Sequence, residues 1–375
     1  MVHGEVIIGT TSLPAVGGPV LDVLMAGPVF FDIVFTDLPA PVLPGQEVWA
    51  AGMGSGPGGI ANLAVAARRL GLSTGLAAGF GDDAYGRWCW DVLSRSEGVD
   101  LSRSRMHDRW HTAVTVSIAM DGDRAMVTHG HEFPLGADEL VGEPPATRSA
   151  LIELPSGPLE HEPWWLRSAR AGALVFADIG WDPTGAWDPA RLAPLASCHA
   201  FSPNQVEAMA YTRTDTPQAA LAALAEHVPL AVVTCGADGA VAHDATTGES
   251  ARVPRVEVPA IDPTGAGDVF AAALVVGTLE GWPLADRLAF SALCSALAVQ
   301  QFGGSLAAPG WGDISDWWSV VRAGGDRDLV RRYGFLDDVV PTHPAERVRR
   351  ADATLTVHSD LPEPPGPGTP NSVQA

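Results

Sequence analysis

Short apolar runs alternate with longer amphipathic stretches along most of the chain. In the first half, runs rich in β-branched and aromatic residues predict strands at 20–26, 29–35, 74–78, 113–120 and 124–128. Apolar positions three and four residues apart predict helices there at about 60–70 and 84–96. The dipeptide Asp121-Gly122 is typical of a hairpin turn between the last two of these strands.

The alternation becomes more regular in the second half of the chain. Short strands are predicted at 173–177, 200–201, 230–234 and 240–243. Helices are predicted around them at about 205–211, 217–227, 266–280 and 284–301. Strands and helices that alternate over such a length predict an α/β fold. Its central sheet should be mostly parallel and covered by helices on both faces.

The two ends of the chain differ from the rest in composition. Residues 1–19 carry clustered Gly, Thr and Ser and are interpreted as a loose lead-in. Residues 20–335 are expected to form one domain, since no internal repeat interrupts the alternation. From residue 341 onward seven prolines fall within 35 residues. Segment 341–375 is therefore predicted to be a Pro/Gly-rich disordered tail.

Composition and charge exclude several classes of function. The 375 residues are 46% hydrophobic, which is enough for a sizeable core. They carry 23 basic against 44 acidic residues, a formal charge of −21, so no nucleic-acid partner is expected. The chain contains no lysine. This excludes a P-loop lysine, the ATP-pairing lysine of protein kinases and any Schiff base on this chain.

Cysteine usage and the N-terminal sequence indicate the compartment. The four cysteines lie far apart, without a CxxC pair or zinc-finger spacing, and are interpreted as buried small hydrophobes in a reducing environment: Cys89, Cys198, Cys235 and Cys294. The most apolar early run, 23–35, is interrupted by Gly27, Pro28 and Asp32. It fits neither a signal peptide nor a membrane span. We therefore expect a cytoplasmic protein with no membrane partner.

The segment Val256–Leu274 contains the strongest candidate chemistry. It is interpreted as a strand, a tight turn with Gly265 and Gly267, and a helix. Backbone N–H groups exposed by such a turn, with a helix dipole behind them, bind phosphate oxygens without a lysine. Asp268 would repel phosphate unless it served as a general base for a hydroxyl proton. The alternative is an ordinary acidic residue that the helix N-terminus stabilises.

A second glycine pattern favours a different class of enzyme. Gly54-Ser-Gly-Pro-Gly-Gly59 fits the form GxGxxG, and Asp82 follows at about the distance of a ribose-binding acid. This pattern would indicate an NAD-dependent oxidoreductase. It is weak in a chain with 41 glycines, and it leaves residues 262–268 unexplained.

One long motif resembles a known family. Asp262-Pro-Thr-Gly-Ala-Gly-Asp268 resembles the C-terminal signature of the ribokinase (PfkB) carbohydrate kinases. Five further segments resemble motifs of that family in the same order along residues 22–310: Gly27–Asp32, Pro57–Gly71, Gly81–Gly86, Asn204–Glu207 and Thr234–Gly239. The resemblance implies a three-layer ribokinase-like fold with a small β-rich lid, for which 36–53 and 107–132 are the candidate segments.

The resemblance also implies roles for individual residues. Sugar hydroxyls would be bound by Asp32, Gly58, Gly59 and Asn62. The nucleotide and Mg²⁺-phosphate side would be formed by Asn204, Glu207, Thr234, Gly236 and Gly239, with Mg²⁺ held indirectly by the first two. Asp262 and Thr264 match a monovalent-cation loop that binds K⁺ in several members. Two of the chain's three asparagines, Asn62 and Asn204, fall on motif positions.

The implied reaction is transfer of the γ-phosphate of ATP to a substrate alcohol. Asp268 would be the base, and the backbone N–H groups of Gly265, Ala266 and Gly267 would stabilise the transferring group. Lid closure would exclude water. Members of the family pair through their lid strands, which favours a homodimer.

The substrate stays open at this point. A monosaccharide of the ribokinase or fructokinase type is the first expectation, and a nucleoside is the nearest alternative. A phosphosugar is disfavoured because Ile60 stands where some members carry a Gly-Lys-Gly run, although Arg87 or Arg109 could replace that lysine. A kinase-like binding protein without catalysis is disfavoured by the intact Asp268 and glycine turn. His107, His111, His129 and His131 are interpreted as solvated lid positions rather than a metal site.

Overall fold

The computed structural model describes residues 20–120, 123–155, 157, 159, 161–343, 348–353 and 355. Its strands are β1 (Leu21–Ala26), β2 (Val29–Thr36), β3 (Gly52–Gly59), β4 (Thr74–Ala77), β5 (Gly79–Gly81), β6 (Arg105–His107), β7 (Ala113–Met120), β8 (Asp123–His129), β9 (Thr147–Glu153), β10 (Leu174–Asp178), β11 (Ala200–Phe201), β12 (Leu230–Thr234), β13 (Ala240–Asp244) and β14 (Glu249–Val253). The predicted lead-in 1–19 lies outside the described residues.

Helices connect most of these strands. The α-helices are α1 (Ala61–Arg69), α2 (Ala84–Asp91), α3 (Ala137–Val141), α4 (Trp164–Arg170), α5 (Gln205–Thr212), α6 (Pro217–Leu224), α7 (Ala266–Leu279), α8 (Leu284–Ala298), α9 (Trp311–Gly324), α10 (Arg327–Tyr333) and α11 (Leu336–Val339). A π-helical turn, Val92–Ser96, extends α2. Short 3₁₀ segments lie at Pro189–Ser197, Gly236–Asp238 and Gly304–Ala307. No helix of the described residues is long and apolar enough to cross a membrane.

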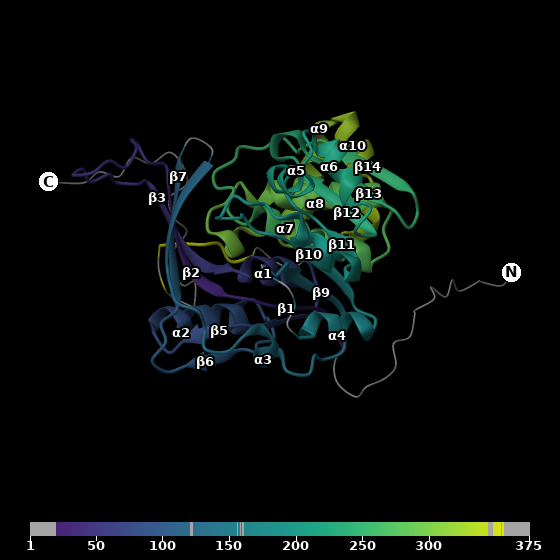
Figure 1. Cartoon of the computed structure of the whole chain (residues 1–375). Coiled ribbons are helices and arrows are strands. Elements are labelled where there is room, and N and C mark those ends of the chain that lie inside the picture. The colour runs from purple at the N-terminus through teal and green to yellow at the C-terminus, as the bar shows by residue number, and fades with distance from the viewer. Residues whose placement is uncertain are drawn as a thin grey trace.

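The main sheet has eight strands in the order β14-β13-β12-β11-β10-β9-β1-β4. The strands from β4 to β12 pair in parallel, whereas β13 and β14 are added antiparallel at one edge. The predicted α/β fold with a mostly parallel sheet is confirmed. A second, four-stranded sheet with the order β3-β2-β7-β8 projects from this body at the left of Figure 1. We call it the small sheet.

Each face of the main sheet has its own hydrophobic core. Val23 and Met25 of β1 belong to one buried cluster with residues of α1, α7 and α8, while Leu24 between them belongs to a second cluster with residues of α4, α5 and α6. Side chains alternate between faces along a strand, so apolar residues at every position require helices on both sides. The three-layer arrangement follows from this continuous apolar sequence.

Strand positions were predicted well where the pattern is short and apolar, and poorly elsewhere. The strands at 113–120, 200–201 and 230–234 match β7, β11 and β12 at both ends. The central strand β9 and the edge strand β14 were missed. The strand expected before the glycine turn is wrong, because residues 256–261 form no strand. The preceding strand, β14, has already ended at Val253.

The glycine pattern proposed for NAD is contradicted by its location. Gly54–Gly59 lies inside β3, antiparallel to β2 over its whole length. A dinucleotide-binding fingerprint requires its glycines in the turn between a parallel strand and a helix, at the helix N-terminus. These glycines instead allow close packing: a Cβ on Gly56 would lie 3.0 Å from the carbonyl oxygen of Gly303, and one on Gly54 would overlap the Phe302 ring.

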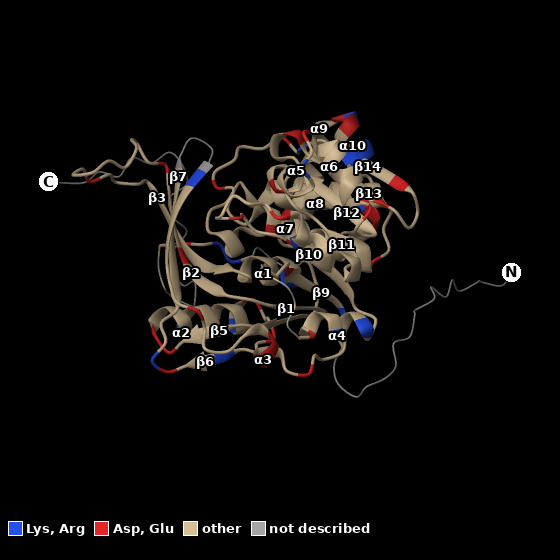
Figure 2. Cartoon of the chain, viewed as in Figure 1, with Lys and Arg blue, Asp and Glu red and all other residues tan. Residues whose placement is uncertain are grey.

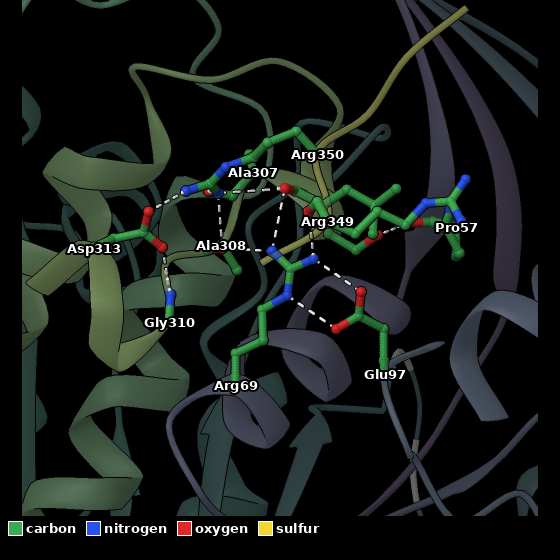
Figure 3. A network of polar contacts seen from close by, with 11 residues as sticks. Pro57, Arg69, Glu97, Ala307, Ala308, Gly310, Asp313, Arg349 and Arg350 are labelled. Carbon is green, nitrogen blue, oxygen red and sulfur yellow. Dashed lines mark hydrogen bonds and ion pairs between the residues drawn. The ribbon is translucent and has the colours of Figure 1, made fainter. Parts of the chain in front are cut away.

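Residues 348–353 differ from the disorder predicted for the tail. Ser55 in β3 donates its N–H to the carbonyl of Asp352 at 2.9 Å. The Arg69 guanidinium, which is 3% exposed, binds both Glu97 oxygens and the carbonyls of Ala308 and Arg349 (Figure 3). Arg350 binds Asp313 and the carbonyl of Ala307. These hydrogen bonds explain why the segment is ordered. Arg69 in the body donates to the Arg349 carbonyl, and Arg350 donates to Asp313 and to the Ala307 carbonyl.

Charged residues are distributed unevenly by sign. Figure 2 shows acidic residues spread over helices and loops of both parts of the molecule, with basic residues at fewer, separate places. This distribution fits the formal charge of −21.

Candidate active site

The candidate residues gather at the carboxyl-terminal edge of the parallel strands. β9 ends at Glu153, β10 at Asp178 and β12 at Thr234. Parallel strands bring their carboxyl ends to one edge of a sheet, which is where α/β proteins bind ligands. Asn204 follows β11 at this same edge and forms a bridge with Thr234. Asp32 of the small sheet lies near this edge, because the charge of Asp268 raises the pKa of the Asp32 carboxyl.

A direct contact joins two motifs that lie far apart in sequence. The Asn62 amide nitrogen in α1 donates to Oδ2 of Asp268 in α7 at 2.9 Å. Asn62 is 6% exposed, and its Oδ1 is buried without a hydrogen-bond partner among the described residues. A Cβ on Gly304 would lie 2.9 Å from that oxygen. The lack of a side chain at Gly304 thus makes room for Asn62 to reach the carboxylate.

The Asp268 carboxyl has an unusual affinity for protons. Burial raises its pKa to about 6, and the hydrogen bond from Asn62 and the charge of Arg124 oppose that rise. Glu153 contributes a smaller increase. A carboxyl with this pKa is ionised at neutral pH and still accepts a proton more readily than an ordinary aspartate does.

Asp32 is the most perturbed carboxyl of the small sheet. It is 7% exposed, and burial raises its pKa to about 7, with further increases from Asp262 and Asp268 and a decrease from the Thr115 hydroxyl. A Cβ on Gly58 would lie 1.9 Å from Oδ2 of Asp32. Gly58 is therefore the residue whose missing side chain lets this carboxyl lie against β3.

The turn before α7 forms only part of the expected ring of donors. Gly265 adopts a left-handed conformation with φ of 76°, which favours glycine. The Gly267 N–H has no acceptor within the described part of the chain, and Gly267 is exposed. The Ala266 N–H differs from the prediction, because it donates to the carbonyl of Pro263 at 3.2 Å. This bond closes the turn and withdraws that donor from the site.

A cavity of about 490 Å³ lies beside this turn. Its wall includes Thr234, Gly236, Gly239 and Gly267, and its apolar side is formed by α7 and α8 residues such as Phe270 and Ala296. Gly239 has φ of 86°, and a Cβ there would lie 1.9 Å from the Val253 carbonyl oxygen. The structure thus brings together three residues predicted for the nucleotide side and two predicted for phosphate, Ala266 and Gly267.

Asn204 and Glu207 hold each other at the start of α5. The Asn204 Oδ1 accepts the N–H groups of Val206 and Glu207, and the Glu207 carboxylate accepts the N–H of Asn204 at 3.1 Å. This is a capping box. Burial raises the pKa of Glu207, and the nearby Glu153 adds to the increase. Local hydrogen bonds to the backbone therefore fix the side chains of Asn204 and Glu207, and the Glu207 carboxylate lies near Glu153.

Two acidic residues of this edge were missed by the sequence analysis. Glu153 and Asp178 end β9 and β10, and burial followed by the charge of Asp268 raises the pKa of Asp178 well above its usual value. Asp178 directly follows the apolar strand predicted at 173–177. That position was the sequence signal that could have identified it. Glu153 was missed with its strand.

Arg124 was also missed, and the register of the small sheet places it. Thr115 is opposite both Asp32 and Thr128, so these residues share one face of the sheet. Ala119 pairs with Arg124 farther along the same face. The charge of Arg124 lowers the pKa of Asp268, so the guanidinium lies near the site. Arg87 pairs instead with Asp82, and Arg109 is 91% exposed beside Asp108.

Asp262 and Thr264 form a buried polar loop next to the turn. Asp262 is 1% exposed and accepts the N–H groups of Thr264 at 2.9 Å and Gly303 at 3.3 Å. The Thr264 hydroxyl is buried without a hydrogen-bond partner among the described residues. A buried carboxylate held by backbone amides, beside a hydroxyl with no partner among the described residues, is a set of hard oxygen donors.

The Gly81–Gly86 motif is explained by packing. Asp83 caps α2 by accepting the Gly86 N–H at 2.7 Å and also accepts the Thr112 N–H at 2.7 Å. A Cβ on Gly86 would lie 2.0 Å from the Gly81 carbonyl oxygen. The motif thus ties the start of β7 to the body.

Comparison with known proteins agrees with this geometry. The sequence model of the pfkB family carbohydrate kinases matches residues 28–310. A fructokinase of Klebsiella pneumoniae is 32% identical over 281 residues, covering 68% of this chain and 89% of the relative. A ribokinase of Schizosaccharomyces pombe is 29% identical over 282 residues, covering 69% and 85%.

Solved structures show the same fold. A putative ribokinase II of E. coli in complex with ATP and Mg²⁺ superposes with a TM-score of 0.66 at 20% identity, covering 80% of this chain and all of the other. This chain belongs to the pfkB family of carbohydrate kinases, phosphotransferases that act on an alcohol group.

Proposed function

We propose that this carbohydrate kinase transfers the γ-phosphoryl group of ATP to a hydroxyl of a small, unphosphorylated monosaccharide. The contact between Asn62 and Asp268 carries the proposal. It joins the helix after the glycine-rich β3 to the first turn of α7. The 490 Å³ cavity borders that turn, and Asp32 lies close enough for the charge of Asp268 to raise its pKa.

Asp268 would act as the general base. It takes the proton of the sugar hydroxyl as the hydroxyl oxygen forms its bond to the γ-phosphorus. The bond from that phosphorus to the bridging oxygen breaks, and ADP leaves with the electron pair. Its pKa of about 6 supports the role, because the carboxyl is then ionised at neutral pH.

The turn before α7 would stabilise charge on the transferring group. The N–H groups of Gly265 and Gly267 and the positive end of the helix dipole support this role. Ala266 would join them only if its bond to Pro263 opened. No lysine is needed, which is consistent with its absence from the chain.

Asp32, Gly58, Gly59 and Asn62 would bind the sugar. Asp32 and Asn62 offer acceptors on the two sides of the site, and both are almost fully buried. Buried polar groups that lack partners discriminate strongly for a ligand that satisfies them. The unpartnered Oδ1 of Asn62 therefore supports a ligand rich in hydroxyl groups.

The cavity beside Thr234, Gly236 and Gly239 would hold the nucleotide, with its apolar wall against the base. Glu153, Asp178 and Glu207, with Asn204, concentrate negative charge at the phosphate end. Burial is the main cause of the raised pKa values of Asp178 and Glu207, and neighbouring carboxyl groups add to the rise, so a divalent cation there would favour ionisation of both groups. Mg²⁺ there would be held partly through water and would neutralise phosphate charge. The E. coli relative was solved with ATP and Mg²⁺.

The loop of Asp262 and Thr264 would bind a monovalent cation such as K⁺. Its support is the buried carboxylate and the unsatisfied Thr264 hydroxyl beside the α7 turn. A cation at this loop would reinforce the positive potential of the turn.

The small sheet would act as the lid. Asp32 lies on its inner face, and closure over the site would exclude water, the competing phosphoryl acceptor. Its outer strand β8 exposes 54% of Met126 and 71% of Val127. Exposed apolar residues on an edge strand support pairing of two copies through the lid.

A second candidate substrate class carries an anionic group. Arg124 on the inner face of the small sheet favours a phosphorylated sugar or a sugar acid. The chain is also similar to an aminoimidazole riboside kinase of Salmonella typhimurium. A nucleoside is therefore included among the acceptors to be tested.

The test is ADP release by the purified chain with MgATP and K⁺. The acceptors are ribose, fructose, 2-keto-3-deoxygluconate, fructose 6-phosphate and adenosine. A neutral sugar should stimulate ADP release, and Asp268→Asn should reduce the stimulated rate by about 10²–10⁴-fold. Asp286→Asn, in the first turn of α8, is the matched control and should retain it. Stimulation only by an anionic acceptor would replace the first substrate class with the second.

A further inference from the structure

Three histidines meet on the small sheet at the end nearest the body. His129 ends β8, His131 follows it by two residues, and His111 lies just before β7. The ring centroids are 5.1 Å apart for His111 and His129, 5.0 Å for His111 and His131, and 5.4 Å for His129 and His131. His107 lies outside this group. We call these three residues the histidine cluster.

The spacing of the histidine cluster suits one metal ion. One ring nitrogen from each residue can be chosen so that all three lie within 4.8 Å of one another. Three imidazoles around a tetrahedral Zn²⁺, with bonds of about 2.0 Å, place their ring centres about 5 Å apart. The centroids already have this separation. Binding would require mainly ring rotation, which the exposed His129 and His131 permit.

The tautomer of His111 is set by its backbone. Nδ1 lies 3.2 Å from the carbonyl oxygen of Thr112, which can only accept a hydrogen bond. Nδ1 therefore carries the proton, and Nε2 presents its lone pair. Histidines that bind metals typically donate their other ring N–H to a carbonyl or carboxylate in this way.

The backbone that carries His111 is held in place before any metal binds. The N–H of Thr112 donates to Asp83 at 2.7 Å, and its hydroxyl accepts the Gly81 N–H at 3.1 Å. On the other strand, His129 is paired with Val114 in the β7–β8 ladder. The ligands thus come from two segments whose relative position the fold determines, which lowers the ordering cost of binding.

The histidine cluster is separate from the proposed catalytic site. Val114 and His129 form a pair one step away from Thr115 and Thr128, so they point to the opposite face of the small sheet. Asp32 shares the face of Thr115. An ion bound by the histidines would lie on the outer face, beside the start of α2. It would not be the Mg²⁺ that accompanies ATP.

We propose that His111, His129 and His131 form a site for a Zn²⁺ ion, with water in the fourth position. Imidazole nitrogen suits zinc and other borderline transition metals, whereas Mg²⁺ and Ca²⁺ prefer oxygen. The ion links the segment before β7 to the segment after β8. It therefore braces the small sheet where both segments join the body. The proposal does not depend on the substrate or the catalytic roles given above.

The test is zinc titration of the full-length chain, purified without a polyhistidine tag. Calorimetry should give one ion per chain, and Co²⁺ should show the visible absorption of a tetrahedral site. Zinc should also raise the melting temperature, because it binds the folded state. The four cysteines are all buried, so they are not expected to compete as ligands.

The variant His129→Gln/His131→Gln should weaken zinc binding by more than about 10²-fold, since even loss of an outer partner of a metal ligand costs about 10–100-fold. Both positions are exposed, so glutamine fits there without repacking. His107→Gln is the matched control and should bind like the parent chain. The proposal is overturned if the parent binds no zinc, or if the double variant binds it as tightly as the control.

Discussion

The body and the small sheet each contribute a carboxyl to the same site, but they hold it by different means. Asp268 lies in the first turn of α7, where a glycine turn and Asn62 position it. Asp32 lies in the middle of β2, where strand register and the missing side chain of Gly58 position it. Groups held by a local turn keep their place when distant parts move. Groups held by register move with their sheet.

The small sheet is also attached unequally along its two edges. At the β3 edge, Ser55 pairs with Asp352, and the Arg69 network anchors that segment to the body (Figure 3). At the β8 edge, Val127 is 71% exposed. The chemistry on the body should therefore depend on single side chains. The function of the small sheet should depend on its anchors as well.

The largest expected effect is on the body. Asp268→Asn should lower kcat by about 10²–10⁴-fold because the hydroxyl proton loses its acceptor. The sugar KM should change much less. Steady-state kinetics, with circular dichroism to check folding, measure both. A variant with near-parental kcat would contradict the assignment of the base.

The next effect concerns the anchored edge. Arg69→Leu leaves the buried Glu97 carboxylate without its partner and should lower the free energy of unfolding by about 3–5 kcal/mol. Arg95→Leu removes an exposed pair with Asp91 and should cost less than about 1 kcal/mol. Urea unfolding of both variants measures the difference. Equal losses would show that the network does not anchor the segment.

Protonation of Asp32 should make stability depend on pH. The raised pKa of about 7 means that the folded chain keeps a proton which the unfolded chain releases above about pH 4. The folded state binds more protons in this window, so stability falls as pH rises from about 4 to about 7. The slope for this group is about 1.4 kcal/mol per pH unit.

Asp32→Asn should remove that contribution and leave those of other groups. Urea unfolding at pH 5 and pH 8 should therefore show a smaller loss of stability in Asp32→Asn than in the parent chain. If both chains lose the same amount, the Asp32 carboxyl is not held protonated by burial.

The smallest effect lies within the working pH range. The value of kcat/KM should fall below about pH 6, approaching tenfold per pH unit, as Asp268 becomes protonated. The residual activity of Asp268→Asn should not show this fall in kcat/KM at low pH. If kcat/KM of the variant still falls below about pH 6, the group that becomes protonated is another one, such as Asp32.

Local motifs explain what was predicted correctly. The glycine turn, the helix at about 205–211 and the strands at 113–120 and 230–234 each follow from a few neighbouring residues. The family resemblance rests on the same short segments. The roles assigned to the site residues stay predictions, although the structure brings most of those residues to one edge.

The incorrect predictions concern segments whose structure depends on residues far away in the sequence. β9 is a central strand that begins with Thr147-Arg148-Ser149 and ends with Glu153, so only three consecutive apolar residues marked it and it was not recognised. Residues 256–261 have a strand-like sequence but no neighbouring strand to pair with. Gly54–Gly59 matches a nucleotide fingerprint, yet it is buried in a strand that needs small residues against Gly303 and Phe302. In each case the deciding partner is distant in sequence.

The sequence by itself determined the α/β fold class and the family, because those depend on local periodicity and on short motifs. Only the tertiary structure decided that Asn62 reaches Asp268 and that Arg124 shares a face with Asp32. It also decided that three of four scattered histidines meet. The physical reason is that strand register and helix packing set these distances, and both are settled by contacts between segments far apart along the chain.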